Sequence, residues 1–416
     1  MVGLPEPVPR LLAARVREAL TDTPVVLIHG PRQSGKTTLA RMVGEKRGYR
    51  YLSFDDDAVR ASAERDPTGF VDELPARAIL DEVQRVPVLF TALKASVDRR
   101  AFPGRFILTG SANVLLIPAL ADSLAGRMGI LRLHPFSQCE LARTTPRFLE
   151  TLFGGRFRSR VTERLGIALA QRIAAGGYPA ALARRSPARR GAWYRDYVET
   201  QVQRDVRDLA RLRSLDTLPR LLALAASHTA CLLNISDLAA PFQVTRPTIH
   251  EHVTLLERVF LLERLPPWHS NLLSRLVKTP KLHIGDTGIA CALLGMDAAS
   301  LQRERDIMGR LLETFVLQEL RRQASGRGDP FSFFHFRDRD DYEVDIVIER
   351  GAGQISGIEV KAAASVSERD LRGLRRLRDA AGSRFARGVV LYDGEAGIDF
   401  GDNLCAVPLR TLWEPS

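Results

Sequence analysis

The stretch over residues 24–46 constrains the fold of this chain more than any other. A short apolar run, PVVLIH, stops at Gly30, and a helical pattern, KTTLARMVGEK, begins at Lys36. Between them the sequence satisfies G-x-x-x-x-G-K-[ST], in which glycines let backbone N–H groups curl around phosphates at the positive end of a helix. A chance match is the alternative, but the strand before the motif and the helix after it are the context that phosphate binding requires.

The same motif assigns roles to single side chains. Lys36 is expected to reach the β- and γ-phosphates of a nucleotide, and the Thr37 hydroxyl is expected to ligate Mg²⁺. The expected nucleotide-binding residues are Gly30, Pro31, Arg32, Gln33, Ser34, Gly35, Lys36, Thr37 and Thr38.

Further polar residues of this site are expected at the ends of later strands. In AILDEVQ, Asp81 closes an apolar strand and should face the Mg²⁺, while Glu82 is placed to polarise an attacking water. Such a pair also occurs as a plain solvated strand end, but its place downstream of a phosphate-binding loop favours catalysis. The following strand ends in LTGSAN, where Ser111, rather than Asn113, is the preferred sensor of the γ-phosphate.

Strand and helix patterns alternate through the first part of the chain. The apolar strand patterns occupy 51–54, 77–82, 105–110 and 129–134, and the helical patterns lie near 58–65, 88–99 and 112–125. This alternation predicts an α/β domain, a parallel sheet with helices on both faces, over residues 1–145.

Helical spacing dominates the expected second domain, residues 146–275. Its second half reads as helix, turn, helix and short strand, the pattern of a winged helix-turn-helix. The second of these helices should begin near Thr245, which can cap it ahead of Pro247. The side chains that it offers for DNA contact are Arg246, Thr248, His250 and His252, whereas Glu251 would oppose a phosphate. A rigid spacer without DNA contact is the alternative.

A third, mixed α/β domain is expected over residues 276–416. It contains a predicted hairpin with Asp345 on one strand and Glu359 and Lys361 on the other, where residues two apart share a face. The two carboxylates of this pattern would hold Mg²⁺, and the lysine would orient or deprotonate water for attack on a phosphodiester.

This hairpin and its flanking elements resemble the restriction-endonuclease-like PD-(D/E)XK fold, whose order of helix, three strands, helix and strand matches residues 309–393. The resemblance implies an acidic residue on the first helix, for which Glu313 is the candidate and Glu319 a substitute. The proline of the motif is missing before Asp345. Two alternatives stay open: solvated surface carboxylates, and a binding module of the same fold that does not cleave.

The series GPRQSGKTTLA, ILDEVQRVP, RFILTGSAN and SLAGRMGILRLHPFS resembles AAA-type ATP-binding proteins of bacteria and archaea that carry a C-terminal domain of unknown function. The resemblance implies an arginine that reaches the γ-phosphate of a neighbouring subunit, and hence a homo-oligomer. Arg127 is the candidate, with a salt-bridged helix end as the alternative, and Arg204 is a weaker candidate for a sensor. No NKxD motif for guanine is present, so ATP is favoured.

The amino-acid composition favours some classes of binding partner over others. With 60 Lys and Arg against 49 Asp and Glu, the net charge of +11 favours phosphate-rich partners, although an Arg-rich solvated surface is the alternative. The four cysteines lack metal-binding spacing, and neither a signal peptide nor a membrane span is evident, which favours the cytoplasm. The sequence therefore predicts a Mg²⁺-dependent AAA-type ATPase coupled to a nuclease-like C-terminal domain, acting on or sensing nucleic acid, DNA more than RNA. The alternative is an ATP-driven switch whose C-terminal domain binds a protein or nucleic acid without cutting it.

Overall fold

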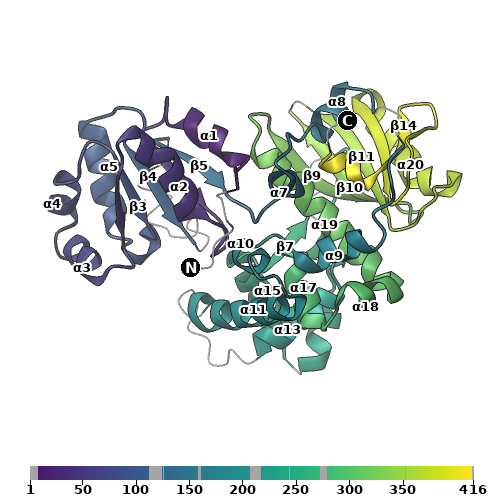
Figure 1. Ribbon diagram of the computed structural model, residues 1–416, viewed down its shortest axis with the longest axis horizontal. Coiled ribbons are helices and arrows are strands. Elements are labelled where there is room, and N and C mark those ends of the chain that lie inside the picture. Colours follow the sequence, from purple (N-terminus) through teal and green to yellow (C-terminus); the bar gives the residue numbers. More distant parts are fainter. Residues whose placement is uncertain are drawn as a thin grey trace.

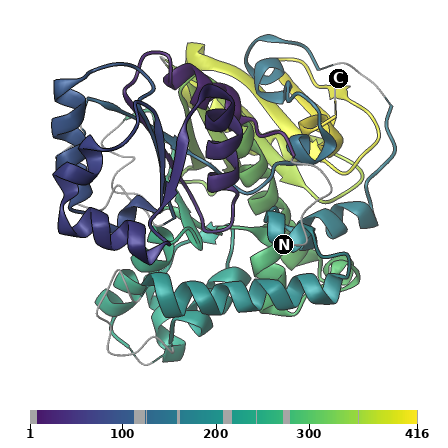
Figure 2. The same cartoon turned by 60° about the vertical axis from the view of Figure 1, so that its left-hand side comes forward.

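The computed structural model describes residues 8–111, 124, 126–157, 161–206, 217–242, 244–271, 279–351 and 353–414. Figure 1 shows three parts: an N-terminal α/β domain, a C-terminal sheet, and a helical part that lies below both. The view in Figure 2 shows the same three parts packed against one another.

The N-terminal domain is built on a five-stranded parallel sheet in the order β2-β3-β4-β1-β5. Its strands are β1 (Val25–His29), β2 (Arg50–Ser53), β3 (Ala78–Asp81), β4 (Phe106–Gly110) and β5 (Met128–Arg132). Its helices are α1 (Leu12–Ala19), α2 (Lys36–Gly44), α3 (Asp57–Arg65), α4 (Pro67–Asp72) and α5 (Leu89–Arg99). The predicted parallel sheet is therefore confirmed, and the helix expected over 112–125 lies outside the described residues apart from Leu124.

Strand β1 shows why this sheet sits in the middle of its domain. All five of its residues are buried. Val25 and Leu27 join the apolar cluster that includes α3, α4 and α5, whereas Val26 and Ile28 join the cluster that includes α1 and α2. A continuous apolar run buried on both faces is typical of a parallel sheet covered by helices on each side.

The middle part combines helices with a small antiparallel sheet in the order β6-β8-β7. Its strands are β6 (Cys231–Leu232), β7 (Leu262–Leu265) and β8 (Lys281–Ile284). Its helices are α9 (Ile167–Ala175), α10 (Pro179–Leu182), α11 (Pro187–Thr200), a π-helix (Gln201–Val206), α13 (Thr217–Ser227), α14 (Ile235–Ala239), α15 (Arg246–Arg258), α17 (Thr287–Leu294) and α18 (Ala298–Arg303). The helix, turn, helix and strand expected here are present as α14, α15 and β7.

Both expected borders of the middle domain differ from the structure. Strand β8 lies beyond residue 275 but pairs with β7, and α17 packs on α11 and α13, so the middle part continues to about α18. Conversely, α7 (Gln138–Ala142) and α8 (Phe148–Gly154) pack toward the C-terminal domain, as Figure 1 shows. Helical spacing shows that one face of a helix is buried, but it does not show which domain covers that face.

The C-terminal domain holds a mixed sheet in the order β13-β14-β12-β11-β10-β9. Its strands are β9 (Phe331–Arg337), β10 (Glu343–Arg350), β11 (Gln354–Lys361), β12 (Phe385–Tyr392), β13 (Ile398–Asp399) and β14 (Leu404–Pro408). Helix α19 (Arg305–Ser325) shares an apolar cluster with Ile346 and Ile358, and α20 (Arg372–Ala381) shares another with Val347 and Val390. The two helices therefore cover opposite faces of the sheet.

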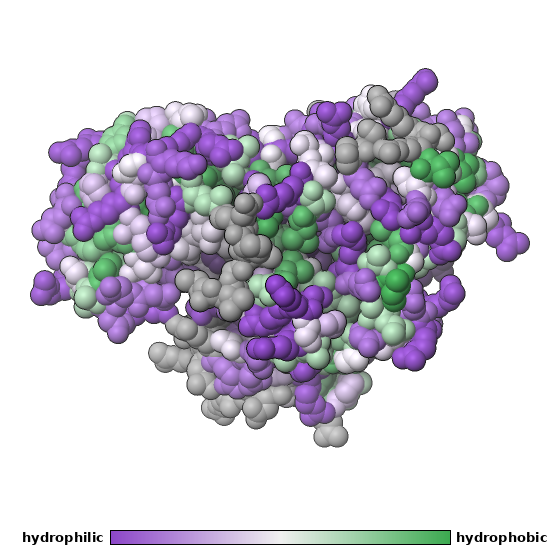
Figure 3. Space-filling view, viewed as in Figure 1, coloured by the Kyte–Doolittle hydropathy of each residue, from purple (hydrophilic) through white to green (hydrophobic). Residues whose placement is uncertain are grey.

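The face shown in Figure 3 is largely hydrophilic, with apolar patches scattered over it. Across the described residues, no helix combines the length and the apolar character that crossing a membrane would need.

Candidate functional site

The loop from Gly30 to Gly35 has a backbone shape that its sequence makes possible. Gly30, Gln33 and Gly35 have φ angles of 151°, 60° and 97°. A Cβ atom on Gly30 would lie 2.2 Å from the carbonyl oxygen of Leu133, so a larger residue would collide with the backbone beside β5. A non-glycine residue at positive φ, such as Gln33, costs conformational energy and is typical of a functional loop.

Two polar groups of this loop point to a phosphate ligand. Lys36 is 5% exposed, and its ammonium donates to the carbonyl oxygens of Gly30 at 3.2 Å and Pro31 at 2.9 Å. The hydroxyl oxygen of Ser34 is buried and has no hydrogen-bond partner within the described chain. Because a buried polar atom without a partner is costly, these groups fit an anion that the loop would enclose.

Asp81 joins the loop to the neighbouring strands. Its carboxylate, at the end of β3, accepts hydrogen bonds from Thr37 at 2.9 Å, from Tyr51 at 2.9 Å and from Thr109. The hydroxyl and carboxylate oxygens that the sequence assigns to Mg²⁺ are therefore in direct contact, and oxygen ligands of this kind suit that ion. When bound with ATP, Mg²⁺ would neutralise charge on the phosphates.

Glu82 and Ser111 meet beside this contact, as the strand order predicts. Strand β4 lies between β1 and β3, and Ser111 follows it directly. The Ser111 hydroxyl donates to the Glu82 carboxylate at 3.0 Å, and Glu82 itself has a φ of 59°. Gln84, which the sequence reasoning did not single out, donates to both Glu82 and Ser111, the latter at 2.9 Å. Glu82, the residue after Asp81, is thus held by two polar neighbours.

Two residues from outside the motif also donate hydrogen bonds to backbone carbonyls of the loop. No local sequence pattern predicts these contacts. Arg10 donates to the carbonyl oxygen of Ser34 at 2.7 Å and pairs with Glu140 at 3.0 Å. Tyr197, on α11, donates to the carbonyl oxygen of Arg32 at 3.2 Å. The loop therefore contacts the middle part of the molecule through its own backbone.

A second connection runs from the end of β5 to the small sheet of the middle part. Arg132 and Arg321 both pair with the Glu263 carboxylate on β7. Next to Arg132 in the sheet, His29 packs against Phe260 with ring centroids 6.0 Å apart. Burial, with Arg132 and Lys36 nearby, lowers the pKa of His29 to about 4, so this ring is neutral at physiological pH.

Arg127 lies at the N-terminal end of the parallel strands, whereas the loop lies at their C-terminal end. It precedes β5, its backbone carbonyl accepts from Val25 at the start of β1, and its guanidinium pairs with Asp98 on α5. Within one chain it therefore stays away from its own phosphate-binding loop. Asn113 lies outside the described residues, as does the side chain of Arg204.

Helix α15 presents a smaller polar surface than the sequence predicts. Thr245 caps it by accepting from the Thr248 N–H at 3.4 Å, as expected, and Arg246, His250 and Glu251 are exposed. His252 is only 5% exposed, and burial lowers its pKa. The expectation that His252 faces DNA is therefore wrong, because helical spacing places it with Ile249 on the buried side.

The second carboxylate cluster forms where the hairpin was predicted. Ile346 of β10 pairs with Ile358 of β11, which sets Asp345 across from Glu359. Asp345 accepts from the Val360 N–H at 2.9 Å, and Lys361 donates to Glu359 at 2.9 Å. The pairing of β10 with β9 shifts register between Val344 and Val347, and a bulge of this kind re-aims side chains.

A lysine that the sequence reasoning missed lies inside this cluster. Lys281, on β8, pairs with Glu313 at 2.8 Å, with Asp345 at 3.5 Å and with Glu343. The Lys281 side chain is 3% exposed. Glu313 is thus placed as expected, whereas Glu319 lies elsewhere, accepting from the N–H of Gln138 at 2.8 Å.

The charges of this cluster depend on one another. Burial would lower the pKa of Lys281, but Glu313, Asp345 and Glu343 raise it, so the lysine stays charged. Burial and the nearby Asp345 carboxylate raise the pKa of Glu359 to about 8. Burial also raises the pKa of Glu313, with Asp345 adding to the effect.

These residues fit a metal ion poorly. Within the part of the chain that the structure describes, no group of three or more His, Cys, Asp or Glu side chains is arranged to hold a metal ion. The oxygens that the sequence assigns to Mg²⁺, on Asp345 and Glu359, contact Lys281 and Lys361 instead. The nuclease roles predicted for these residues stay predictions.

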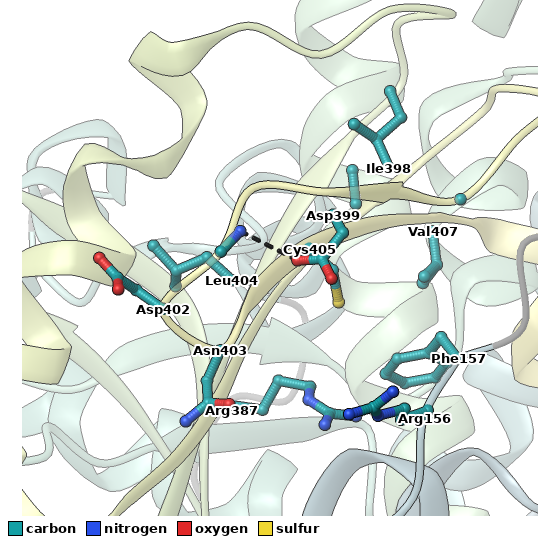
Figure 4. Close-up of a pocket in the computed structure, with 13 residues that line it drawn as sticks. Arg156, Phe157, Arg387, Ile398, Asp399, Asp402, Asn403, Leu404, Cys405 and Val407 are labelled. Carbon is teal, nitrogen blue, oxygen red and sulfur yellow. Dashed lines mark hydrogen bonds between the residues drawn. The ribbon is translucent and has the colours of Figure 1, made fainter.

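A separate cavity of about 380 Å³ lies at the β13–β14 edge of the C-terminal sheet. Figure 4 shows Arg156 and Arg387 on one side of it and Asp399 and Cys405 on the other. None of the expected site residues lines it, so it is independent of both clusters.

Comparison with known proteins gives the family. A model described as an AAA domain matches residues 22–142, and two models described as domains of unknown function, DUF8612 and DUF4143, match residues 167–300 and 308–412. Uncharacterized proteins of Mycobacterium tuberculosis and Mycobacterium bovis are each 31% identical over 398 residues, 95% of this chain and 82% of theirs.

Two solved structures are similar to parts of the chain. A Walker-type ATPase of Pyrococcus abyssi is 16% identical and has a TM-score of 0.38 over 70% of this chain and 99% of its own. The RuvB Holliday junction branch migration motor of Thermotoga maritima is 20% identical and has a TM-score of 0.27 over 62% of this chain and 86% of its own. Scores this low say nothing about substrates or partners. The chain belongs to the same family as the two mycobacterial proteins, and its N-terminal part matches an AAA domain.

Proposed function

We propose that this protein is a Mg²⁺-dependent ATPase in which nucleotide turnover changes how the middle and C-terminal parts engage nucleic acid. The contact between Thr37 and Asp81 at 2.9 Å carries the ATPase half of this proposal, because it joins the phosphate-binding loop to the acidic end of a neighbouring strand. Lys36 would bind the β- and γ-phosphates, Glu82 would orient or deprotonate the attacking water, and Ser111 would hold Glu82.

The ATPase half is tested by replacing the loop lysine. Lys36→Ala should abolish ATP hydrolysis in a phosphate-release assay while the circular dichroism spectrum and the melting temperature stay close to those of wild type. Met42→Ala is a matched control, because Met42 is exposed on the same helix and lies outside the residues expected to bind the nucleotide. Undiminished turnover in Lys36→Ala would refute the assignment.

The nucleic-acid half is supported by three features. The order α19, β9, β10, β11, α20, β12 is that of a nuclease-like core, Asp345, Glu359 and Lys361 gather on its hairpin, and the net charge is +11. The position of Lys281 among the carboxylates favours the second candidate, a nuclease-like domain that binds nucleic acid without cutting it.

This half is tested by running the ATPase assay with single-stranded DNA, duplex DNA and RNA, each followed by gel analysis. At least one nucleic acid should change the turnover rate, and the effect should weaken steeply as salt rises because binding releases counterions. A rate unchanged by all three would leave the ATPase assignment standing and favour a protein partner.

A further inference from the structure

The acidic cluster of the C-terminal domain contains a charged lysine where its nuclease-like pattern calls for a metal ion. Lys281 is 3% exposed and lies 2.8 Å from a Glu313 oxygen and 3.5 Å from an Asp345 oxygen. It also pairs with Glu343. A buried ammonium needs such partners, because an unpaired charge away from water is very costly.

The remaining oxygens of the cluster are largely engaged as well. One Asp345 oxygen accepts from the Val360 N–H, and one Glu359 oxygen accepts from Lys361. The other Glu359 oxygen is buried without a partner within the described chain. A divalent cation bound here would lie against the Lys281 ammonium, and repulsion between like charges is strong in a buried site.

The backbone holds Lys281 in this place. It is the first residue of β8, and it pairs with Leu265 of β7 on one side and Leu232 of β6 on the other. The backbone of a residue in the central strand of a three-stranded sheet cannot shift without disturbing two ladders, so the base of this side chain is fixed next to the cluster. The lysine is therefore a fixed component of the cluster, contributed by the middle part of the molecule.

We propose that Lys281 is a built-in cation that takes the place of a divalent metal ion, so that the C-terminal domain binds nucleic acid without cutting it. Lys361, whose side chain is 35% exposed, is then the cationic group of the cluster that phosphates can approach. This inference rests on the nuclease-like character proposed for the domain and is independent of ATP hydrolysis.

Calorimetric titration of the full chain with Mn²⁺ tests the proposal. An Asp81→Asn background without nucleotide removes the contribution of the ATP site. In that background Lys281→Met should gain one Mn²⁺ site per chain, and adding Asp345→Asn should abolish it. Lys281→Arg keeps the charge and should bind no more Mn²⁺ than the parent. A folded Lys281→Met variant that gains no site would overturn the proposal.

Two further comparisons do not require Lys281→Met to fold. First, the Asp81→Asn chain with Lys281 intact should bind the same amount of Mn²⁺ with and without Asp345→Asn. This should hold in the presence and in the absence of a non-hydrolysable ATP analogue. Wild type should also leave single-stranded and duplex DNA uncut in Mn²⁺. A Mn²⁺ site or a cleavage activity that Asp345→Asn removes from a Lys281-containing chain would overturn the proposal. None of these readouts uses ATP turnover, so failure here and failure of the ATPase assignment are distinguishable.

Discussion

At the scale of single residues, the proposed hydrolysis depends most on Glu82, which follows Asp81 and accepts hydrogen bonds from Ser111 and Gln84. Glu82→Gln keeps the shape of the side chain but removes its negative charge, so ATP should still bind while turnover falls by about 10²-fold or more. Single-turnover hydrolysis and titration with a fluorescent ATP analogue separate these two effects. Gln84→Ala removes only one hydrogen bond to Glu82, so its ATP turnover should fall less than that of Glu82→Gln. Wild-type turnover in Glu82→Gln would exclude it as the group that activates water.

The same scale shows what the sequence could predict about the site. The proximity of Thr37 to Asp81 and of Ser111 to Glu82 could be predicted, because a contiguous motif and the ends of parallel strands bring them together. Tyr197 and Lys281 were missed because neither belongs to a recognisable motif or to a strand end of the first sheet, and only chain folding brings each of them to its partners. His252 was misjudged although Ile249 and Leu256 lie three residues before it and four residues after it, an apolar helical spacing that was available in the sequence.

At the scale of elements, the contact between β5 and β7 joins the N-terminal domain to the middle part. Burial would raise the pKa of Glu263, but Arg132 and Arg321 hold it well below its usual range. Glu263→Gln should therefore lower the free energy of unfolding by about 3 kcal/mol at neutral pH, because it leaves two arginines uncompensated. The surface pair of Arg327 and Glu150 is the control, and Glu150→Gln should cost less than about 1 kcal/mol in the same urea titrations.

The pH dependence of this contact has a definite sign. A depressed carboxyl pKa contributes stability that is complete above the ordinary glutamate pKa of about 4.3 and is lost as the pH falls below it. The free energy of unfolding of wild type should therefore exceed that of Glu263→Gln by less at pH 3 than at pH 7 in urea titrations, although part of the difference remains at pH 3. A difference that stays constant over this range would mean that packing, and not charge, holds β5 to β7.

The sequence predicted most helices and strands well, but it did not predict which domain each of them joins. The five strands of the first sheet and the hairpin of β10 and β11 follow from apolar runs bounded by turn residues. Strand β8 was assigned to the wrong domain because KLHI reads as a strand whichever sheet receives it. The pairing of strands that are far apart in the sequence depends on how the core assembles. A short stretch of sequence therefore does not show which strand will be its partner.

At the scale of the whole molecule, the position of Arg127 bears on assembly. It lies at the start of β5, whereas the phosphate-binding loop follows the end of the parallel strand β1, so any nucleotide that Arg127 contacts is bound by a second copy. Arg127→Ala should then reduce ATP turnover by about 10³-fold or more. Mixing it with Lys36→Ala should restore part of the activity, because the Lys36→Ala subunit donates an intact arginine to an intact loop.

The intramolecular pair of Arg127 with Asp98 supplies the control for this experiment. Asp98→Ala breaks the same ion pair but keeps the arginine, so it should retain turnover if Arg127 acts in trans. If the pair serves stability alone, Asp98→Ala and Arg127→Ala should lower the melting temperature equally, and mixing should restore nothing. Because a shared site also requires assembly, activity in the mixture should rise with protein concentration, as should the fraction of oligomer measured by light scattering. Turnover that is independent of concentration would place the complete ATP site within one chain.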